Sequence, residues 1–457
     1  MAKTRTQHVC NECGASSPTW VGRCPGCEAW GTLVEEIVAP TSGGSTARLG
    51  SSASPVPIGA VATDEWQALP TMIGELDRVL GGGLVPGSVT LIGGEPGVGK
   101  STLLLQLVAS YAKRSRRSLY VTAEESAPQV HQRAERLGLL HEQLFVVPET
   151  VLPHVLAHIE EVKPEVVVVD SIQTVHDPAL TSAPGSVSQV RHAAHHLVGL
   201  AKRLGVAVVL VGHVTKDGSL AGPRVLEHVV DTVLDFEGDR QQGLRMLRPV
   251  KHRFGATSEV GLFEMGDTGL RDVPDPSELF LADRVRDVAG SVVVPTVEGH
   301  RPVLVEIQAL VSNSSLASPR RSVQGVDPGR LAMLLAVLQQ RLRLFEARSD
   351  VYALAVGGAR VLEPGADLGL ALAVVSSLTN RALPDSLVVC GEVGLAGEVR
   401  RVAHLERRLR EAARLGFTQA IVPPSDVEAP VGLKLTTVAS LGEAIARTGV
   451  AASVHPI

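Results

Sequence analysis

The length, composition and charge of the chain exclude several classes of protein. Its 457 residues are too many for one hydrophobic core and fit two or three domains. With 44% hydrophobic and 20% charged residues, it is expected to be globular rather than disordered. The net charge of -5 means that any nucleic-acid surface must be a local patch. The longest apolar run, LAMLLAVL at 331–338, is too short to span a bilayer, which predicts a cytoplasmic protein with no membrane partner.

The first 27 residues hold four of the five cysteines, in the pairs CNEC and CPGC. Two such pairs can supply four thiolates to one tetrahedral Zn²⁺ ion. We therefore predict a zinc ribbon over residues 1–36, in which the metal stabilises a segment with few apolar residues. Two disulfides are the alternative. The predicted zinc ligands are Cys10, Cys13, Cys24 and Cys27.

Residues 37–57 are rich in Ser, Gly, Pro and Ala and lack hydrophobic periodicity, which predicts a flexible linker. From 58 to 272, apolar strand-like runs alternate with amphipathic helical segments. This alternation predicts an α/β domain built of βαβ units around a largely parallel, buried sheet.

The first of these strands, SVTLIGG, leads directly into GEPGVGKST, which fits the phosphate-binding P-loop pattern. The glycines let backbone N–H groups approach phosphate, Lys100 can reach the outer phosphates, and Ser101 can offer a hydroxyl to Mg²⁺. The predicted nucleotide-binding residues are Gly94, Glu95, Pro96, Gly97, Val98, Gly99, Lys100, Ser101 and Thr102.

Carboxylates follow two further strands of this domain. The run VVVVD ends at Asp170, where a carboxylate is expected beside the Mg²⁺ ion, although a helix-capping aspartate would look the same. Together with the P-loop, it predicts an NTPase that uses ATP and Mg²⁺. The run SLYVT leads to Glu124 and Glu125, and a carboxylate there could orient the attacking water as a general base. A surface acidic pair is the alternative reading.

Several segments together resemble the RadA (Sms) family of bacterial DNA-repair proteins, which are RecA-like ATPases. They are IGELDRVLGGGLVPGSVTLIGGEPGVGKST, TAEES, VVVVDSIQT, LVGHVTKDGSLAGPRVLEHVVDTVL and KHRFG. The resemblance includes the ribbon and the C-terminal part, so it covers nearly the whole chain. It implies a DNA-dependent ATPase that binds single-stranded and branched DNA, drives branch migration as a hexameric ring, and meets a RecA-type recombinase.

The resemblance also implies roles for individual residues. Glu124 corresponds to the catalytic glutamate, Asp170 to the metal-binding aspartate, and His213 to a position that senses the γ-phosphate. The loops at 171–192 and 214–224 match segments that contact single-stranded DNA in ring-shaped relatives. They lack aromatic residues, so they would follow phosphates rather than stack bases, unless they are plain surface loops. Their cations, the predicted DNA-binding residues, are Lys216, Arg224 and Arg191.

The segment KHRFG, residues 251–255, matches the family's Lys-Asn-Arg-Phe-Gly except at His252. In RecA-like rings the nucleotide lies at a subunit boundary, where a cation of the neighbouring subunit completes the site. The resemblance therefore implies catalytic roles for Lys251 and Arg253 in the neighbour's site. A solvated basic turn is the alternative.

Residues 273–457 resemble the Lon protease domain, an α/β unit of the ribosomal S5 domain 2-like fold. Asp367 stands where Lon has its nucleophilic serine, and Arg408 where Lon has its catalytic lysine. An aspartate is a poor acyl acceptor for peptide hydrolysis, and an arginine cannot act as a general base. We therefore predict a domain that lacks the catalytic dyad and has no peptidase activity. The basic face predicted for the helix AHLERRLREAARLG suits subunit packing, nucleic acid or solvent.

The residues leave a second class of function open. A RecA-like ring of the KaiC type would hydrolyse ATP as a regulatory scaffold without acting on DNA. Stimulation of hydrolysis by DNA would separate the two.

Overall fold

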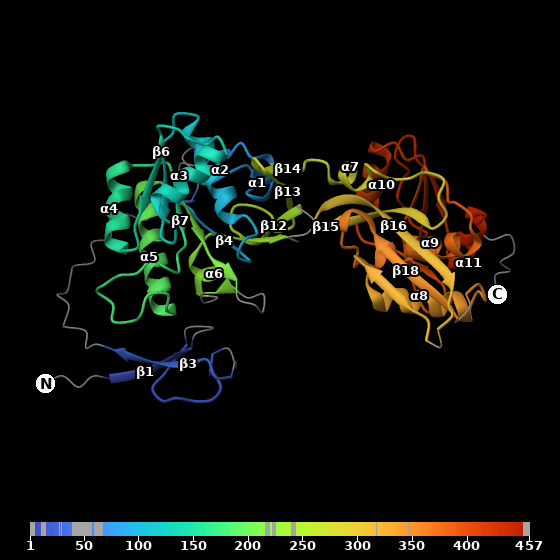
Figure 1. Ribbon diagram of the computed structural model, residues 1–457, viewed down its shortest axis with the longest axis horizontal. Helices are drawn as coiled ribbons and strands as arrows, with labels where there is room; N and C mark the ends of the chain where they lie inside the picture. The colour runs from blue at the N-terminus through green and yellow to red at the C-terminus, as the bar shows by residue number, and fades with distance from the viewer. Residues whose placement is uncertain are drawn as a thin grey trace. The chain divides into compact units, whose positions relative to one another are not determined.

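The computed structural model describes residues 5–10, 15–26, 28, 30–38, 57–58, 67–214, 220–221, 225–238, 244–316, 318–345 and 348–450 (Figure 1). The chain divides into two compact units, residues 1–274 and 275–457. Within the described residues, no helix is both long and apolar enough to cross a membrane.

The ribbon is a small antiparallel sheet in which β1 (Arg5–Cys10) pairs with β2 (Ser16–Ser17) and with β3 (Leu33–Val38). The third strand continues past residue 36, where the ribbon was predicted to end. Cys10, Cys24 and Leu33 are buried together in one small cluster. A core this small leaves the segment dependent on a further stabilising bond.

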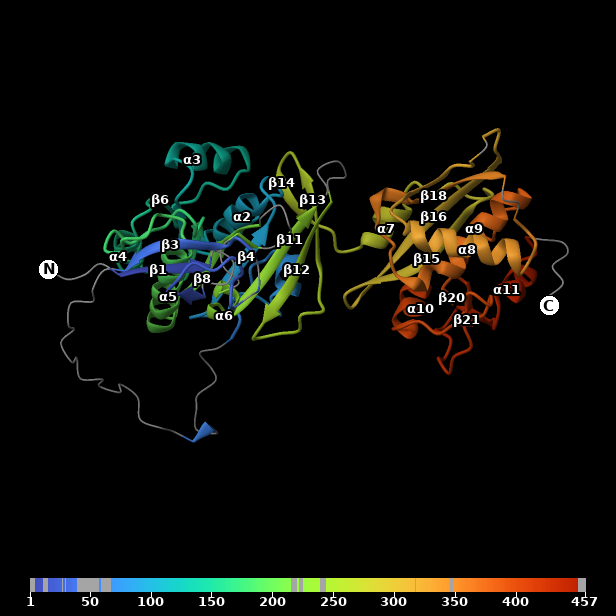
Figure 2. The same cartoon turned by 90° about the horizontal axis from the view of Figure 1, so that it is seen from below.

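A nine-stranded sheet forms the centre of the first unit, in the order β14-β13-β12-β11-β4-β8-β7-β5-β6. Strands β11, β4, β8, β7, β5 and β6 run parallel to one another, and β12 to β14 are antiparallel additions (Figure 2). The bounds are β4 (Val89–Gly94), β5 (Ser118–Thr122), β6 (Leu144–Pro148), β7 (Val166–Asp170), β8 (Ala207–Val211), β11 (Thr232–Gly238), β12 (Leu244–His252), β13 (Gly261–Gly266) and β14 (Gly269–Asp272).

Helices cover both faces of this sheet, which explains why β4, β5, β7 and β8 are buried along their whole length. One hydrophobic core holds residues of α2, and the other holds residues of α4 and α5. The bounds are α1 (Gly74–Val79), α2 (Lys100–Ala112), α3 (Ala127–Arg136), α4 (Leu152–Val162), α5 (Val187–Leu204) and α6 (Val225–Val229). The predicted α/β class with a largely parallel, buried sheet is confirmed.

Strand order decides what gathers at the nucleotide site. Strands β4, β8, β7 and β5 are consecutive neighbours in the sheet. Because they are parallel, their carboxyl ends meet at one edge, where ligands bind in open α/β sheets. The P-loop, His213, Asp170 and Glu124 follow these four strands in that order, so the sequence motifs share one edge.

The second unit holds a seven-stranded mixed sheet in the order β17-β18-β16-β15-β19-β22-β23. Helix α9 is buried from Asp367 to Ser376 and contacts β15 and β16. The strands are β15 (Ser291–Glu298), β16 (Arg301–Asn313), β17 (Arg321–Gln324), β18 (Ser349–Ala355), β19 (Leu387–Val389), β22 (Gln419–Val422) and β23 (Lys434–Thr437), with a separate pair β20 (Glu392–Val393) and β21 (Val399–Arg400). The helices are α7 (Pro276–Leu281), α8 (Pro328–Gln340), α9 (Asp367–Thr379), α10 (Leu405–Arg414) and α11 (Leu441–Thr448).

Candidate nucleotide site

The P-loop joins β4 to the N-terminus of α2, and its backbone conformation requires glycine at two points. Gly94 has φ of 150°, and a Cβ atom there would lie 2.3 Å from the Phe236 carbonyl oxygen. Gly99 has φ of 115°, and a Cβ atom there would lie 2.6 Å from Met265 Cε. The loop therefore approaches its neighbours too closely for side chains, as a loop that wraps phosphate with N–H groups requires.

Lys100 begins α2, and its side chain returns over the loop. Its Nζ donates hydrogen bonds to the carbonyl oxygens of Gly94 at 2.7 Å and Glu95 at 3.0 Å. Burial lowers the pKa of Lys100, while the carboxylates of Asp170 and Glu124 oppose that shift. The ammonium group thus lies inside the loop, within the field of the two carboxylates predicted for catalysis.

Asp170 ends β7, and a buried tyrosine of the neighbouring strand β5 holds its carboxylate. The Tyr120 hydroxyl donates to Asp170 Oδ2 at 2.5 Å. Burial raises the pKa of Tyr120 well above its ordinary value, so the hydroxyl stays protonated. The buried phenol thus fixes one oxygen of the carboxylate that was predicted to bind Mg²⁺.

The two glutamates after β5 have different partners. Glu124 is exposed and accepts a hydrogen bond from the hydroxyl of Ser171, the residue after Asp170. Glu125 forms an ion pair with Arg133 of α3. The Glu124 carboxylate therefore lies beside the end of β7, whereas the Glu125 carboxylate is engaged with a helix. This placement supports the choice of Glu124 over Glu125 as the predicted base.

Two further charged residues lie beside the P-loop, and the sequence analysis missed both. Asp235 of β11 pairs in register with Gly93, and burial, together with the neighbouring Glu237, raises its pKa. Arg245 of β12 is 5% exposed and donates from Nε to the Val98 carbonyl oxygen at 3.0 Å. Arg245 and Val98 are 147 residues apart in sequence, so only the strand order β12-β11-β4 could have indicated these contacts.

Comparison with known proteins agrees with this geometry. An AAA domain model matches residues 56–219, and a rubredoxin metal-binding domain model matches residues 8–35. The curated DNA repair protein RadA of Bacillus subtilis is 47% identical over 97% of this chain and 99% of the relative. The protein of the same name from Pseudomonas aeruginosa is 51% identical over 97% and 99%. The chain belongs to the RadA family. The resemblance predicted from its motifs is confirmed.

This RadA-family chain is an ATPase by its P-loop and by its AAA domain match. Among solved structures, a KaiC-like protein from Pyrococcus horikoshii aligns with a TM-score of 0.39 and 20% identity over 46% of this chain and 100% of its own. Structural similarity at this level does not support an inference about function.

The ribbon of this family member carries features of a thiolate metal site. Cys10 and Cys24 come from different CxxC pairs yet share one buried cluster. The Gly26 N–H group points to Cys24 Sγ at 3.3 Å, the kind of hydrogen bond that stabilises a metal-bound thiolate. These residues fit Zn²⁺, which agrees with the matched metal-binding family. Cys13 and Cys27 lie outside the described residues, so ligation by all four cysteines stays a prediction.

The segment after β7 that was predicted to contact DNA is closed by one buried side chain. Gln189 accepts from the Asp177 N–H group at 2.8 Å and donates to the carbonyl oxygens of Asp177 at 3.1 Å and Ser182 at 2.9 Å. Arg191 follows on the exposed surface of α5. The loop is therefore held at its base by α5, which carries the predicted DNA contact Arg191.

Three other predicted residues are described only in part or not at all. His213 begins the short strand β9 (His213–Val214), which pairs with β10 (Leu220–Ala221), but its side chain lies outside the described residues. Lys216 and Arg224 also lie outside them. Their roles toward the γ-phosphate and DNA stay predictions.

The KHRFG segment lies at the end of the sheet away from its own P-loop. His252 pairs with Thr232, and Thr232 pairs with Thr90 near the start of β4. The four steps from Thr90 to Gly94 span roughly 13 Å at about 3.3 Å per residue. His252 Nδ1 lies 3.1 Å from Thr232 Oγ1, and burial lowers the pKa of this histidine. The segment is thus separated from the nucleotide site of its own subunit by most of a strand.

The two cations of this segment have partners within their own subunit. Lys251 Nζ donates to the carbonyl oxygens of Glu227 at 2.6 Å and Val230 at 2.7 Å, at the end of α6. Arg253 Nη1 donates to Asp231 Oδ1 at 3.0 Å, and the Arg253 side chain is 50% exposed. Arg253 therefore presents a charged group to the surface.

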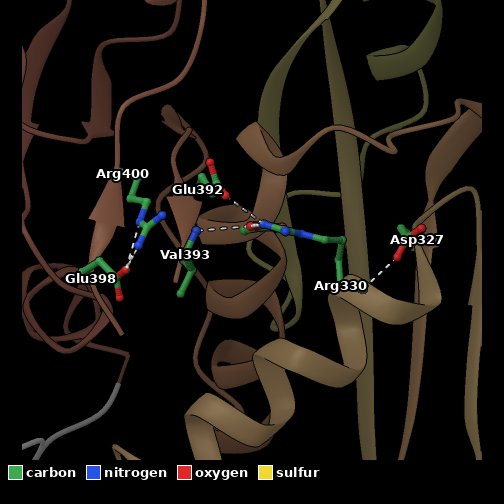
Figure 3. A network of polar contacts seen from close by, with 7 residues as sticks. Asp327, Arg330, Glu392, Val393, Glu398 and Arg400 are labelled. Atoms are coloured by element: carbon green, nitrogen blue, oxygen red, sulfur yellow. Dashed lines mark hydrogen bonds and ion pairs between the residues drawn. The ribbon is translucent and has the colours of Figure 1, made fainter. Parts of the chain in front are cut away.

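In the second unit, the two positions aligned with the Lon dyad have separate partners. Asp367 is 2% exposed and accepts from Arg330 Nε at 3.0 Å and from the Val393 N–H group at 3.2 Å. In Figure 3 the guanidinium of Arg330 also points towards Glu392. The buried Arg408 instead pairs with another acid. Both positions hold the fold through ion pairs, which supports the prediction that no peptidase dyad exists there.

The pair of Arg408 and Glu363 is bidentate, with both N···O distances at 2.6 Å. Arg408 also donates to the carbonyl oxygens of Pro295 at 2.6 Å and Ala403 at 2.9 Å. Burial opposes ionisation of Glu363, but Arg408 outweighs it, and the pKa of Glu363 is lowered. This is a bidentate charge pair in which Arg408 is buried and Glu363 is partly exposed.

The basic face predicted for α10 stays a prediction, because Arg407, Arg410 and Arg414 are exposed on that helix. Arg408 points into the core rather than outward. Arg410 pairs with Glu406, and Arg414 pairs with Glu411 at 2.8 Å. The sequence pattern shows the amphipathic period but not that one arginine occupies the buried side.

Replacing Arg408 with methionine should destabilise the second unit by about 1–3 kcal/mol, because the partly buried Glu363 carboxylate would lose its bidentate partner. Denaturant unfolding of the purified chain measures this. Arg407→Met is the matched control, since Arg407 is exposed on the same helix and should cost less than about 0.5 kcal/mol. Equal losses in the two variants would contradict the role of the buried pair, and Glu363→Gln added to Arg408→Met should restore part of the loss.

Proposed function

We propose that this chain is a DNA-stimulated ATPase of recombinational repair, which binds single-stranded DNA and moves DNA branch points as a ring-shaped, hexameric motor. The main support for a ring of subunits is the position of the KHRFG segment. Its cations flank His252, whose pairing position lies roughly 13 Å along the sheet from the P-loop of the same subunit, which favours service to a nucleotide in another subunit. Family membership supports the repair role, because the relatives are named DNA repair proteins.

Hydrolysis would proceed through residues gathered at one sheet edge. The P-loop N–H groups and Lys100 bind the phosphates, and Glu124 orients the attacking water. Ser101 and Asp170 would hold Mg²⁺, since Ser101 follows Lys100 in the first turn of α2 and Asp170 ends β7. When bound, the ion neutralises charge on the outer phosphate oxygens. Lys251 and Arg253 of the neighbour would stabilise the charge that develops during transfer.

DNA would bind along the two loops that follow β7 and β8. These loops leave the same sheet edge as the catalytic carboxylates, so movement of a loop can be coupled to the state of the nucleotide. Arg191, Lys216 and Arg224 would contact phosphates. Branched DNA and a RecA-type recombinase are the partners that a branch-migration motor requires.

The test is steady-state ATP hydrolysis by the full chain with and without single-stranded oligonucleotide. We expect the rate to rise on addition of DNA and the stimulation to weaken with salt, because phosphate contacts release counterions. Lys100→Ala should be inactive in both conditions, which controls for a contaminating ATPase. A rate unchanged by saturating DNA would instead favour a regulatory ATPase scaffold.

A further inference from the structure

Asp231 lies between α6 and β11 and is bonded to the start of the central strand β4. Its side chain is only 7% exposed. The Asp231 N–H group donates to the Val89 carbonyl oxygen at 2.9 Å, and the Val89 N–H group donates to Asp231 Oδ2 at 3.0 Å. Because Val89 is the first residue of a strand that is buried along its whole length, these two bonds fix Asp231 to the sheet.

The other oxygens of Asp231 hold Arg253. The Arg253 N–H group donates to the Asp231 carbonyl oxygen at 3.2 Å, and Arg253 Nη1 donates to Asp231 Oδ1 at 3.0 Å. Both the backbone and the side chain of Arg253 are thus bonded to one residue. A guanidinium group carries five N–H donors, and the bond to Oδ1 uses one of them. With the side chain half exposed, the group can bind Asp231 and an external anion at the same time.

Asp231 also offsets the repulsion between the two cations of KHRFG. Burial and the nearby Arg253 lower the pKa of Lys251, whereas Asp231 and Glu227 oppose that shift. Lys251 Nζ is held beside the same position, because it donates to the carbonyl oxygen of Val230 at 2.7 Å. The buried carboxylate therefore lets two like charges stay close together in one short segment.

We propose that Asp231 is a positioning residue for Arg253, holding its guanidinium at the subunit surface in the orientation that reaches the outer phosphate of ATP bound to a neighbouring subunit. This inference rests on the proposed function in one respect, namely that Arg253 serves the neighbour's nucleotide. A free arginine side chain loses rotamer entropy when it docks on a phosphate. Attachment to β4 through Asp231 removes part of that cost before the neighbour arrives, as preorganised sites require.

Asp231→Asn tests this role, because asparagine keeps the size of the side chain but removes its charge. It also offers one oxygen where aspartate offers two, so the β4 N–H group and Arg253 no longer have separate acceptors. Glu75→Gln is the matched control. Glu75 is 2% exposed and binds the Leu262 N–H group at 2.9 Å and Arg78 at 3.5 Å. The measurements are steady-state hydrolysis by the full chain over a range of ATP concentrations, and thermal unfolding.

We expect Asp231→Asn to lower kcat by roughly ten- to hundredfold, the value of one hydrogen bond to a charged group. The KM for ATP should stay close to the parental value, because the P-loop is unchanged. Glu75→Gln should keep a kcat near the parental value, although it weakens buried bonds of the same kind. A parental or higher kcat in Asp231→Asn, or an equal loss in both variants, would overturn the proposal.

Mixed rings show whether the defect of Asp231→Asn lies at the cation or in the P-loop of the same subunit. Asp231→Asn subunits keep an intact P-loop, and Lys100→Ala subunits keep an Arg253 that is still held by Asp231. Hydrolysis by the mixture should therefore exceed the sum of the separate rates. If Asp231 only supports β4 and the P-loop that follows it, both variants are defective at the P-loop and no activity returns, which contradicts the positioning role.

Arg253→Ala separates the proposal from the function on which it rests. If Arg253→Ala is slow and Asp231→Asn is not, the positioning role fails while service to the neighbour stands. If Arg253→Ala hydrolyses ATP at the parental rate, service to the neighbour fails and the positioning role fails with it.

Arg253→Lys provides a second test should Asp231→Asn unfold more readily than Glu75→Gln. The substitution lies on a half-exposed side chain, so the subunit should stay folded. A lysine has a single nitrogen, which cannot bind Asp231 and present a second nitrogen to a phosphate. Hydrolysis should therefore fall by roughly tenfold or more. A parental rate in Arg253→Lys would show that no held guanidinium is needed.

Discussion

Arg253→Ala is expected to reduce ATP hydrolysis by roughly 10³- to 10⁵-fold while leaving the subunit folded, because an arginine at the transferring phosphate supplies charge that no other group replaces. The folded state should survive because the Arg253 side chain is half exposed, and the buried Asp231 keeps the hydrogen bond that its Oδ2 accepts from the Val89 N–H group at 3.0 Å. Steady-state hydrolysis and thermal unfolding measure the two effects separately.

Arg203→Ala is the matched control for that experiment. Arg203 is also an exposed arginine in an ion pair, with Glu160, but it lies on α5 away from the KHRFG segment. Its loss should leave hydrolysis near the parental rate. A normal rate in Arg253→Ala would mean that KHRFG is a solvated turn that binds Asp231 and does nothing for the nucleotide.

Mixing subunits decides whether Arg253 acts on the neighbour. Lys100→Ala removes the phosphate-binding ammonium, and Arg253→Ala removes the cation on the opposite end of the sheet, so each variant alone should be inactive. In mixed rings some boundaries join an intact P-loop to an intact Arg253, and activity should partly return. Rings verified to contain both variants but showing no recovery would argue against action between subunits.

The nucleotide site was predictable from the sequence where the chemistry lies in a contiguous motif. The P-loop between Gly94 and Thr102 carries its own geometry, since its glycines and lysine are neighbours in the chain. Asp170 and Glu124 were predictable because each follows a recognisable apolar strand. Parallel strands place such residues at one edge without further information.

Residues that reach the site across the sheet could not be predicted in this way. Tyr120 looks like any aromatic residue of a buried strand, and its role depends on the pairing of β5 with β7. Arg245 reaches the P-loop only because β12 lies beside β11. Strand order comes from long-range packing, which a local pattern does not contain. The same limit applies to Arg408, whose partner Glu363 lies 45 residues away.

Glu124→Gln should slow ATP hydrolysis by roughly 10²- to 10⁴-fold while nucleotide affinity stays close to the parental value. The amide keeps the size of the side chain but cannot accept the proton of the attacking water. Binding should persist because the P-loop and Lys100, which contact the phosphates, are unchanged. Single-turnover hydrolysis and binding of a fluorescent ATP analogue measure the two properties independently.

Glu125→Gln is the isosteric control, one residue further along. Its carboxylate pairs with Arg133 and faces α3, so its loss should leave hydrolysis within about threefold of the parental rate, an effect below about 1 kcal/mol. Lys100→Ala should show the opposite profile to Glu124→Gln, with weakened binding. If Glu125→Gln slows hydrolysis as much as Glu124→Gln, the base has been assigned to the wrong glutamate. If Glu124→Gln weakens nucleotide binding as much as Lys100→Ala, the Glu124 carboxylate supports the P-loop rather than the attacking water.

Ser171→Ala should hydrolyse ATP at a rate between those of the parental chain and Glu124→Gln. It removes only the hydroxyl that holds the Glu124 carboxylate beside β7.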